Sequence, residues 1–171
     1  GSNVSSDQRE RLLGLVFAEG SARAPGSSEN RVDPAVLADV IAGLVFAQRP
    51  ITEAGKEAAQ LYDLGPRGTF ILSLVSRGVR YPKDLAIVLR VGRSLVSAEL
   101  SRLTDAGLIT ATEGDDRRRT ELSLTPLGES VNASVRSKLT GSLERSLAAY
   151  SADQIALFAQ MLREVGRGAG R

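Results

Sequence analysis

The sequence predicts a mainly α-helical fold with one small β-hairpin, which places the protein in the α+β class. Two observations lead to this prediction. Apolar residues recur three and four positions apart through most of the 171 residues, as they do on the buried face of a helix. Between Leu108 and Thr125 the spacing changes to alternation, which is typical of half-buried strands.

The N-terminal part, residues 1–32, carries little information about the fold. Its first two residues resemble the remnant of an expression tag. Asp7 to Glu19 has apolar residues on one helical face, which predicts a short amphipathic helix. Pro25 and Gly26 interrupt the small polar residues that follow, so we expect a linker before residue 33.

A firmer helical segment is predicted for residues 33–63, as an N-terminal dimerisation helix. Asp33 is a capping residue, and Pro34 suits the first helical position. The apolar stripe that follows consists of Val36, Leu37, Val40, Ile41, Leu44 and Val45. Pro50 should kink or break the helix because proline lacks a backbone donor, and Thr52 could cap a continuation to Tyr62.

Three short helical units are predicted next. Gly78 should close the first unit, Pro82 should open the second, and Gly107 should end the third. Their predicted core positions are Phe70, Ile71, Leu74 and Val75 in the first, Leu85, Ala86 and Leu89 in the second, and Leu95 or Val96, Leu100 and Leu103 in the third.

A β-hairpin is predicted directly after the third unit. Leu108 to Thr112 and Glu121 to Thr125 would be its strands, and Gly114 to Arg119 (GDDRRR) its loop. Taken alone, such a charge run is most simply a solvated turn. Three helices followed by a hairpin with a charged tip are, however, the order of a winged helix-turn-helix, here residues 64–125.

The C-terminal part, residues 126–171, predicts two further helices. A long helix opens at Thr125-Pro126, and Ser151 to Gln154 is a capping box that opens the last one. Their apolar stripes are Val131, Val135, Leu139, Leu143 and Leu147 in one, and Ile155, Phe158, Met161, Leu162 and Val165 in the other. These stripes could be intramolecular core or a dimer interface. We favour the dimer, because one small domain cannot cover all of them.

The composition excludes several classes of function. The chain has no cysteine and no histidine, which removes disulfides, thiol chemistry, the commonest metal ligand and the usual general base. Nucleophile and phosphate-loop motifs are also missing, so we expect neither an enzyme nor a cofactor or metal site. The net charge of +2 decides nothing by itself. We see no apolar run of about 18 residues, and we expect a cytoplasmic protein with no membrane partner.

Four motifs follow one another in the segment VGRSLVSAELSRLTDAGLITATEGDDRRRTELSLTPLG. A short helix rich in serine and leucine precedes L-x-x-x-G-L-I (Leu103 to Ile109), D-R-R (Asp116 to Arg118) and L-x-L-T-x-x-G (Leu122 to Gly128). In this order and spacing the chain resembles the MarR family of bacterial transcription regulators, over roughly Leu64 to Gly128. The flanking helices agree with the family's plan by position rather than by motif.

The resemblance implies a homodimer that binds double-stranded DNA at an inverted repeat. The helix from Arg93 would enter the major groove, where base edges differ in donors and acceptors, and the wing would reach the minor groove, where arginine suits a narrow, electronegative channel. The implied DNA-binding residues are Lys83, Arg93, Ser94, Ser97, Ser101, Arg102, Arg117, Arg118 and Arg119.

The chain departs from the family pattern at two positions of this helix. Gly92 stands where a serine or threonine cap is common, and Ala98 stands where many members carry an arginine. Two neighbours allow alternatives: Glu99 could face away from DNA or accept from a cytosine amino group, and Arg102 could contact DNA or pair with Asp105.

The expected function is that of a repressor released from its operator by a small organic effector, such as an aromatic acid. Without histidine or cysteine, sensing of metals or oxidants is disfavoured. Candidate effector-binding residues near the junction with the winged unit are Arg49, Tyr62, Arg67 and Phe70, arginine being suited to clamp a carboxylate. The alternative is a winged-helix module for protein contact, or a structural dimer, without a ligand response.

Overall fold

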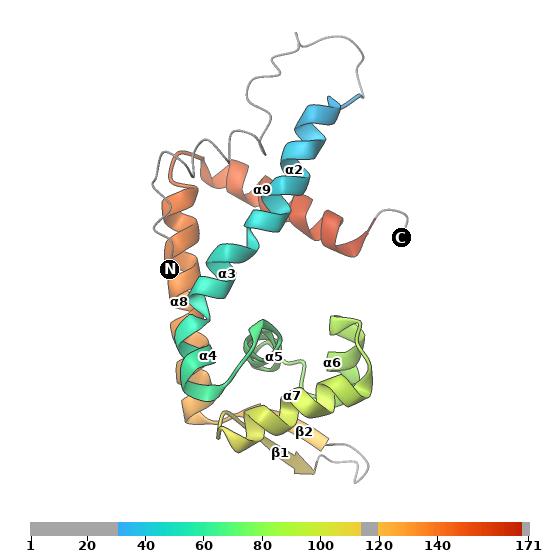
Figure 1. The fold of residues 1–171 in the computed structure, drawn as a ribbon, viewed down its shortest axis with the longest axis vertical. Coiled ribbons are helices and arrows are strands. Elements are labelled where there is room, and N and C mark those ends of the chain that lie inside the picture. The colour runs from blue at the N-terminus through green and yellow to red at the C-terminus, as the bar shows by residue number, and fades with distance from the viewer. Residues whose placement is uncertain (1–30, 114–119, 169–171) are drawn as a thin grey trace, which may run out of the picture. The chain divides into compact units, whose positions relative to one another are not determined.

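The computed structural model describes residues 31–113 and 120–168 (Figure 1). Its helices are α2 (Pro34–Phe46), α3 (Gln48–Ala54), α4 (Lys56–Tyr62), α5 (Pro66–Ser76), α6 (Pro82–Leu89), α7 (Arg93–Asp105), α8 (Pro126–Ser146) and α9 (Ala152–Arg167). Strands β1 (Ile109–Glu113) and β2 (Thr120–Leu124) form an antiparallel hairpin, so the predicted α+β class is confirmed. The contacts divide the chain into two compact units between Arg49 and Pro50. The helix and linker predicted for residues 7–30 lie outside the described residues.

Helix α2 begins and ends for reasons that are visible in the sequence. Asp33 caps it by accepting a hydrogen bond from the backbone N–H of Ala35 at 2.9 Å, as predicted. The helix is interrupted at Ala47, one turn before Pro50, because the proline ring crowds the carbonyl four residues upstream and offers it no donor. The predicted capping role of Thr52 is wrong: Thr52 lies inside α3, and Gly55 is the residue before α4.

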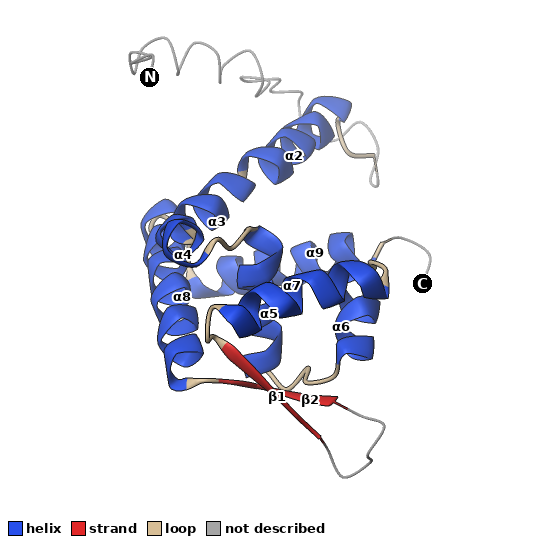
Figure 2. Ribbon diagram, turned by 60° about the horizontal axis from the view of Figure 1, so that its bottom comes forward, coloured by secondary structure: helices blue, strands red, loops and turns tan. Residues whose placement is uncertain are grey.

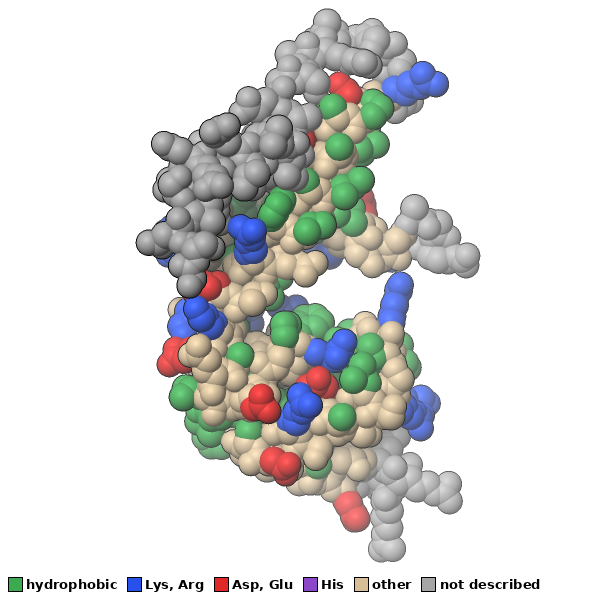
Figure 3. Space-filling view, viewed as in Figure 1, with side chains coloured by type: hydrophobic (Ala, Val, Ile, Leu, Met, Phe, Trp, Pro, Cys, Tyr) green, Lys and Arg blue, Asp and Glu red, His purple; other side chains and the backbone are tan. Residues whose placement is uncertain are grey.

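The apolar stripe of α2 is exposed along its length, and Figure 3 shows hydrophobic side chains along this helix. Together α2 and α3 form a stretch of 21 residues that is long and apolar enough to cross a membrane, by length and composition. No such stretch is predicted from the sequence, because Asp39, Gln48 and Arg49 interrupt its apolar residues. A single helix of this kind is weak evidence for a membrane span, since the core helix of a soluble protein and a signal sequence meet the same criteria of length and composition.

The core of the second unit joins α5, α6, α7 and the hairpin. Its buried side chains are Leu64, Ile71, Leu72, Leu74, Val75, Leu85, Val96, Leu103, Leu108, Ile109 and Leu122. The three predicted helical units and the hairpin are therefore confirmed. One core position was predicted wrongly: Phe70 is 50% exposed, because the buried face of α5 instead runs through Gly68, Ile71, Leu72 and Val75.

The hairpin has a continuous register from Ile109 opposite Leu124 to Glu113 opposite Thr120. The backbone N–H of Leu122 also donates to the carbonyl of Arg80 at 2.7 Å, which ties the segment before α6 to the edge of β2. Figure 2 shows the two strands projecting past the helices of this unit. The connecting loop, Gly114 to Arg119, lies outside the described residues.

Thr125 joins the end of α7 to the start of α8. Its N–H donates to the carbonyl of Leu108 at 3.1 Å, its hydroxyl donates to the carbonyl of Gly107 at 2.6 Å, and the same hydroxyl accepts from the N–H of Gly128 at 3.0 Å. Gly128 is buried against this turn, where a Cβ would collide with the carbonyl oxygen of Leu108. The L-T-x-x-G sequence therefore holds α8 directly on the turn that follows α7.

The two C-terminal helices begin as predicted. Thr125 caps α8, and Ser151 and Gln154 form the capping box of α9. No residue of α9 is buried in this single chain. Its exposed apolar side chains include Ile155, Phe158, Met161, Leu162 and Val165.

Candidate nucleic-acid interface and the neighbouring cavity

Helix α7 has two chemically different faces. Val96, Glu99 and Leu103 are buried toward the core at successive turns of the helix. The opposite side is exposed and carries the residues of α7 that were predicted to contact DNA: Arg93, Ser94, Ser97, Ser101 and Arg102. An exposed helix with short polar side chains and flanking cations has the shape and the donors that a major groove accepts.

Glu99 points away from this exposed face. It is 8% exposed, and its Oε1 lies 3.8 Å from Nη1 of Arg67 on α5. The cytosine contact that we considered for Glu99 is therefore wrong, because its side chain is enclosed between two helices. Arg102 and Asp105 are both exposed, and none of the ion pairs between described residues joins them.

Other cations lie beside α7. Lys83 is exposed in the first turn of α6. Arg90 is exposed and has the left-handed backbone conformation (φ 55°) that ends α6 before the turn into α7. Arg90 is not among the DNA-binding residues predicted from the sequence, although a cation in the turn between two helices of this order is a recognisable signal. The wing residues Arg117, Arg118 and Arg119 lie outside the described residues.

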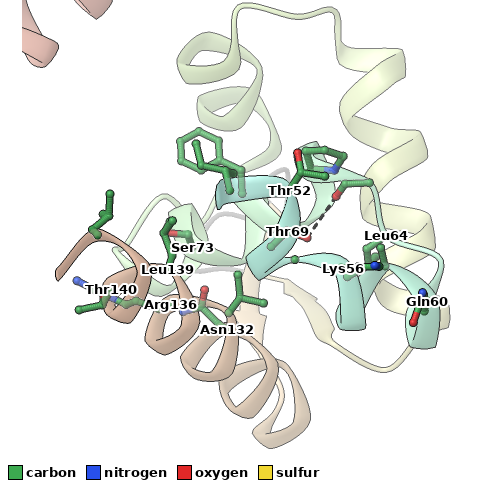
Figure 4. A pocket seen from close by; sticks show the side chains of 18 of the residues that line it. Thr52, Lys56, Gln60, Leu64, Thr69, Ser73, Asn132, Arg136, Leu139 and Thr140 are labelled. Carbon is green, nitrogen blue, oxygen red and sulfur yellow. Dashed lines mark hydrogen bonds between the residues drawn. The ribbon is translucent and has the colours of Figure 1, made fainter. Parts of the chain in front are cut away.

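A cavity of about 660 Å³ lies within the second unit between α3 and α4, α5, and α8 (Figure 4). Figure 4 shows Lys56, Gln60 and Leu64 on one side and residues of α8 on the other. The apolar part of the lining includes Ile51, Leu64, Phe70, Val135, Leu139 and Leu143. A volume of this size and an apolar wall are typical of sites for small organic ligands.

The charges on the cavity wall are all positive. Lys56, Arg77 and Arg136 belong to its lining, and no carboxylate does. The cavity therefore favours an organic anion with an apolar body. These cations were missed from the sequence because they come from segments far apart in the chain. The described residues contain no group of three or more acidic side chains that could hold a metal ion.

Of the four sequence-predicted effector residues, Phe70 lines this cavity. The guanidinium of Arg49 lies 4.9 Å from the centroid of the Phe46 ring. Tyr62 packs against the hydrophobic core, and Arg67 pairs with Glu99.

An ion pair connects α4 with α8 beside the cavity. Nζ of Lys138 donates to Oε2 of Glu57, and each residue is next in sequence to one that lines the cavity, Leu139 and Lys56. The hydrogen bond and the positive charge of Lys138 lower the pKa of Glu57 below its ordinary value.

Glu57→Gln should therefore make thermal stability less dependent on pH in acid. Because the folded-state pKa is lowered, the ion pair stabilises the fold above the ordinary pKa of 4.5 and ceases to do so as pH falls through the folded-state value. The effect should be small and weaker in salt, since the pair is exposed. Melting temperatures of both proteins should differ at pH 7, and the difference should shrink as pH falls below 4.5, with Glu144→Gln on α8 as the control. A difference that stays constant over this range would contradict the assignment.

Comparisons with known proteins give matches among solved structures alone: no protein-family model and no curated protein matches the chain. A MarR family protein from Bacillus stearothermophilus matches with a TM-score of 0.62 at 18% identity, covering 80% of this chain and 97% of that one. The transcriptional regulator BldR from Sulfolobus solfataricus matches with a TM-score of 0.61 at 20% identity, covering 81% and 100%. Wild-type MarR from E. coli in its apo form matches with a TM-score of 0.59 at 18% identity, covering 79% and 98%. These matches show that the chain has the winged-helix fold of MarR family regulators, as the motifs predicted.

Proposed function

We propose that this chain, which has the fold of MarR family regulators, is a sequence-specific DNA-binding transcriptional regulator that acts as a homodimeric repressor. The observation that carries the proposal is the exposed polar face of α7, which the winged-helix core supports from behind through Val96 and Leu103. We also infer that the protein is cytoplasmic and has no catalytic activity, in keeping with the description of structural neighbours such as BldR as transcriptional regulators.

The proposed roles of the residues on and beside α7 follow from the geometry of the major groove. The face of α7 with Ser94, Ser97 and Ser101 would read base edges in the major groove, while Arg93, Arg102 and Lys83 would bind phosphates or bases at its rims. A dimer with two-fold symmetry would place two such helices on an inverted repeat, with half-site centres about one helical turn or roughly 10 base pairs apart.

The experiment that tests the proposal is selection of genomic DNA fragments by the purified protein, followed by footprinting of the fragments it retains. We expect a footprint with two-fold symmetry, and the genes beside it would indicate the regulated function. Failure to retain any fragment in preference to competitor DNA at a stated salt concentration would favour the protein-interaction or structural module instead.

The wing supplies the first mutational prediction. Arg118→Ala should weaken binding to the selected DNA by about 1–3 kcal/mol, because Arg118 is the last residue of the D-R-R motif at the hairpin tip. Stability should change by less than about 0.5 kcal/mol. Gel-shift titration would measure the affinity, with Arg145→Ala on α8 as a control for the loss of one positive charge. Equal affinity of Arg118→Ala and the unchanged protein would remove the wing from the proposed interface.

The cavity supports an effector site for a small organic anion, such as an aromatic acid. The three cations of its wall would neutralise the anion, and the apolar lining would cover its body. Because α5 belongs both to the cavity wall and to the winged core, a ligand could change the DNA affinity by a linkage of about 1–3 kcal/mol.

Arg136→Met tests the effector site. A thermal-shift panel of aromatic acids and their coenzyme A thioesters should contain compounds that stabilise the unchanged protein and release DNA in a gel shift. Arg136→Met should bind those compounds at least about tenfold more weakly, the loss expected for one charged hydrogen bond. Arg145→Met is the matched control outside the cavity. If zinc or peroxide released the DNA and no organic compound did, the effector proposal would be wrong.

A further inference from the structure

Glu99 is a buried charge in the middle of the proposed recognition helix. Among the described residues it is the one buried side chain that is polar or charged. Its Oε1 faces Nη1 of Arg67 at 3.8 Å, while its Oε2 is buried and has no hydrogen-bond partner. A carboxylate in this position costs stability, because it has lost water without gaining a full set of donors.

The carboxylate of Glu99 lies beside the first turn of α5. Pro66, Arg67 and Gly68 are the first three residues of this helix, and Gly65 before them provides no side-chain cap. The first turn of a helix carries a partial positive charge, and α5 has no acidic residue of its own there. Glu99 therefore supplies from α7 the negative charge that the N-terminus of α5 lacks.

Gly68 makes the space for this contact. A Cβ built at Gly68 would lie 3.3 Å from Oε2 of Glu99 and 3.5 Å from Cδ2 of Leu64. A side chain at this position would therefore press on the carboxylate. The glycine and the glutamate fit each other across the interface between α5 and α7.

A leucine at position 99 would bury the same face of α7 without the cost of a charge. The side chain of Arg67 is 43% exposed, so a leucine at position 99 would leave that charge in contact with water rather than buried without a partner, and stability alone does not explain Glu99. The attraction of a carboxylate to a guanidinium and to a helix N-terminus depends on direction, whereas apolar contact is non-directional. We propose that Glu99 is a positioning residue, which holds α7 on the first turn of α5 at the angle needed for base contact; this inference rests on the proposed DNA-binding function.

The same turn of α5 is also part of the cavity wall. Gly65, Pro66 and Thr69 line the cavity, and the hydroxyl of Thr69 donates to the carbonyl of Gly65 at 3.3 Å (Figure 4). A molecule in the cavity would therefore contact the turn whose other side holds Glu99. The contact between Glu99 and α5 therefore joins the cavity wall to the proposed recognition helix.

Glu99→Leu and Glu99→Gln test the positioning role on the full-length protein, with DNA selected by the unchanged protein. Glu99→Leu should melt at the same or a higher temperature, yet bind the selected DNA about tenfold more weakly. Its affinity for non-specific DNA should stay within about twofold, because phosphate contacts do not depend on the exact angle of α7. Glu99→Gln keeps the shape and loses the charge, and should show the same loss of preference to a smaller degree.

Gly68→Ala provides a second test that leaves the charge in place. Its Cβ should displace the carboxylate and reduce the preference for the selected DNA, whereas Gly141→Ala in α8, where the nearest atom is the flexible end of Arg145, should not. If all three variants kept the preference of the unchanged protein, or if specific and non-specific affinity fell together with the melting temperature, the positioning role would be overturned. If the unchanged protein showed no preference for selected over non-specific DNA, both the proposed function and the positioning role would be wrong. If the unchanged protein and the variants showed the same preference, the positioning role alone would be overturned.

Discussion

Gly128→Ala is expected to destabilise the protein by at least about 3 kcal/mol, the upper end of what overpacking usually costs. The added methyl group would collide with the carbonyl oxygen of Leu108 and lie 3.0 Å from its carbonyl carbon. Both are backbone atoms, so no side chain can rotate to make room. Separation of α8 from the turn would also stretch the hydrogen bonds of Thr125 to Gly107 and Leu108.

The matched control for this prediction is Gly141→Ala in the same helix. A Cβ at Gly141 meets only the end of the Arg145 side chain, at 3.4 Å, so alanine should be neutral or stabilising there by up to about 1 kcal/mol. Urea denaturation followed by circular dichroism would give both free energies of unfolding. A loss of less than about 1 kcal/mol for Gly128→Ala would mean that α8 lies farther from the turn than the structure places it.

The same motif illustrates what the sequence could and could not predict. L-x-L-T-x-x-G was noticed as part of a family resemblance, and the threonine cap of α8 followed from local chemistry. The reason for the glycine did not, because the crowding atom belongs to Leu108, which lies twenty residues earlier in the chain. Caps, breaks and strand alternation are local signals and were predicted well, with Thr52 as the exception.

Features that depend on the packing of distant segments were predicted less well. The direction of Glu99 stayed open because a glutamate normally avoids the core, and its partners Arg67 and Gly68 lie on another helix. The charged lining of the cavity was missed for the same reason, since Lys56 of α4, Arg77 at the end of α5 and Arg136 of α8 come together only when the chain folds. The wing was predicted as a hairpin, and its strands are confirmed, but the arginines at its tip remain a prediction.

The second large effect is expected from α9, whose apolar face covers nothing in the single chain. Ile155, Phe158 and Met161 are all exposed, although α9 is strongly amphipathic by its spacing. Exposed apolar stripes of this length usually mark an interface, and we propose that this one, together with the exposed stripe of α2, forms the homodimer. Each protomer would then bury its own Phe158 against its partner.

Phe158→Glu should convert the dimer into a monomer and abolish binding to the inverted repeat. Burial of one phenylalanine side chain stabilises an interface by about 1.5–3 kcal/mol, and a two-fold dimer would lose this contribution twice. The cost of burying two carboxylates adds to that loss. Ala156→Glu adds the same charge on the opposite side of α9 and should leave the dimer intact, which separates a specific interface from a general effect of charge. Sedimentation at micromolar concentration would give the assembly state, and gel shift the DNA affinity. If the unchanged protein sedimented as a monomer, the proposed dimer would be wrong. If Phe158→Glu remained a dimer with full DNA affinity, the stripe of α9 would not be the dimer interface, because an interface cannot bury a carboxylate at its centre without a partner for the charge.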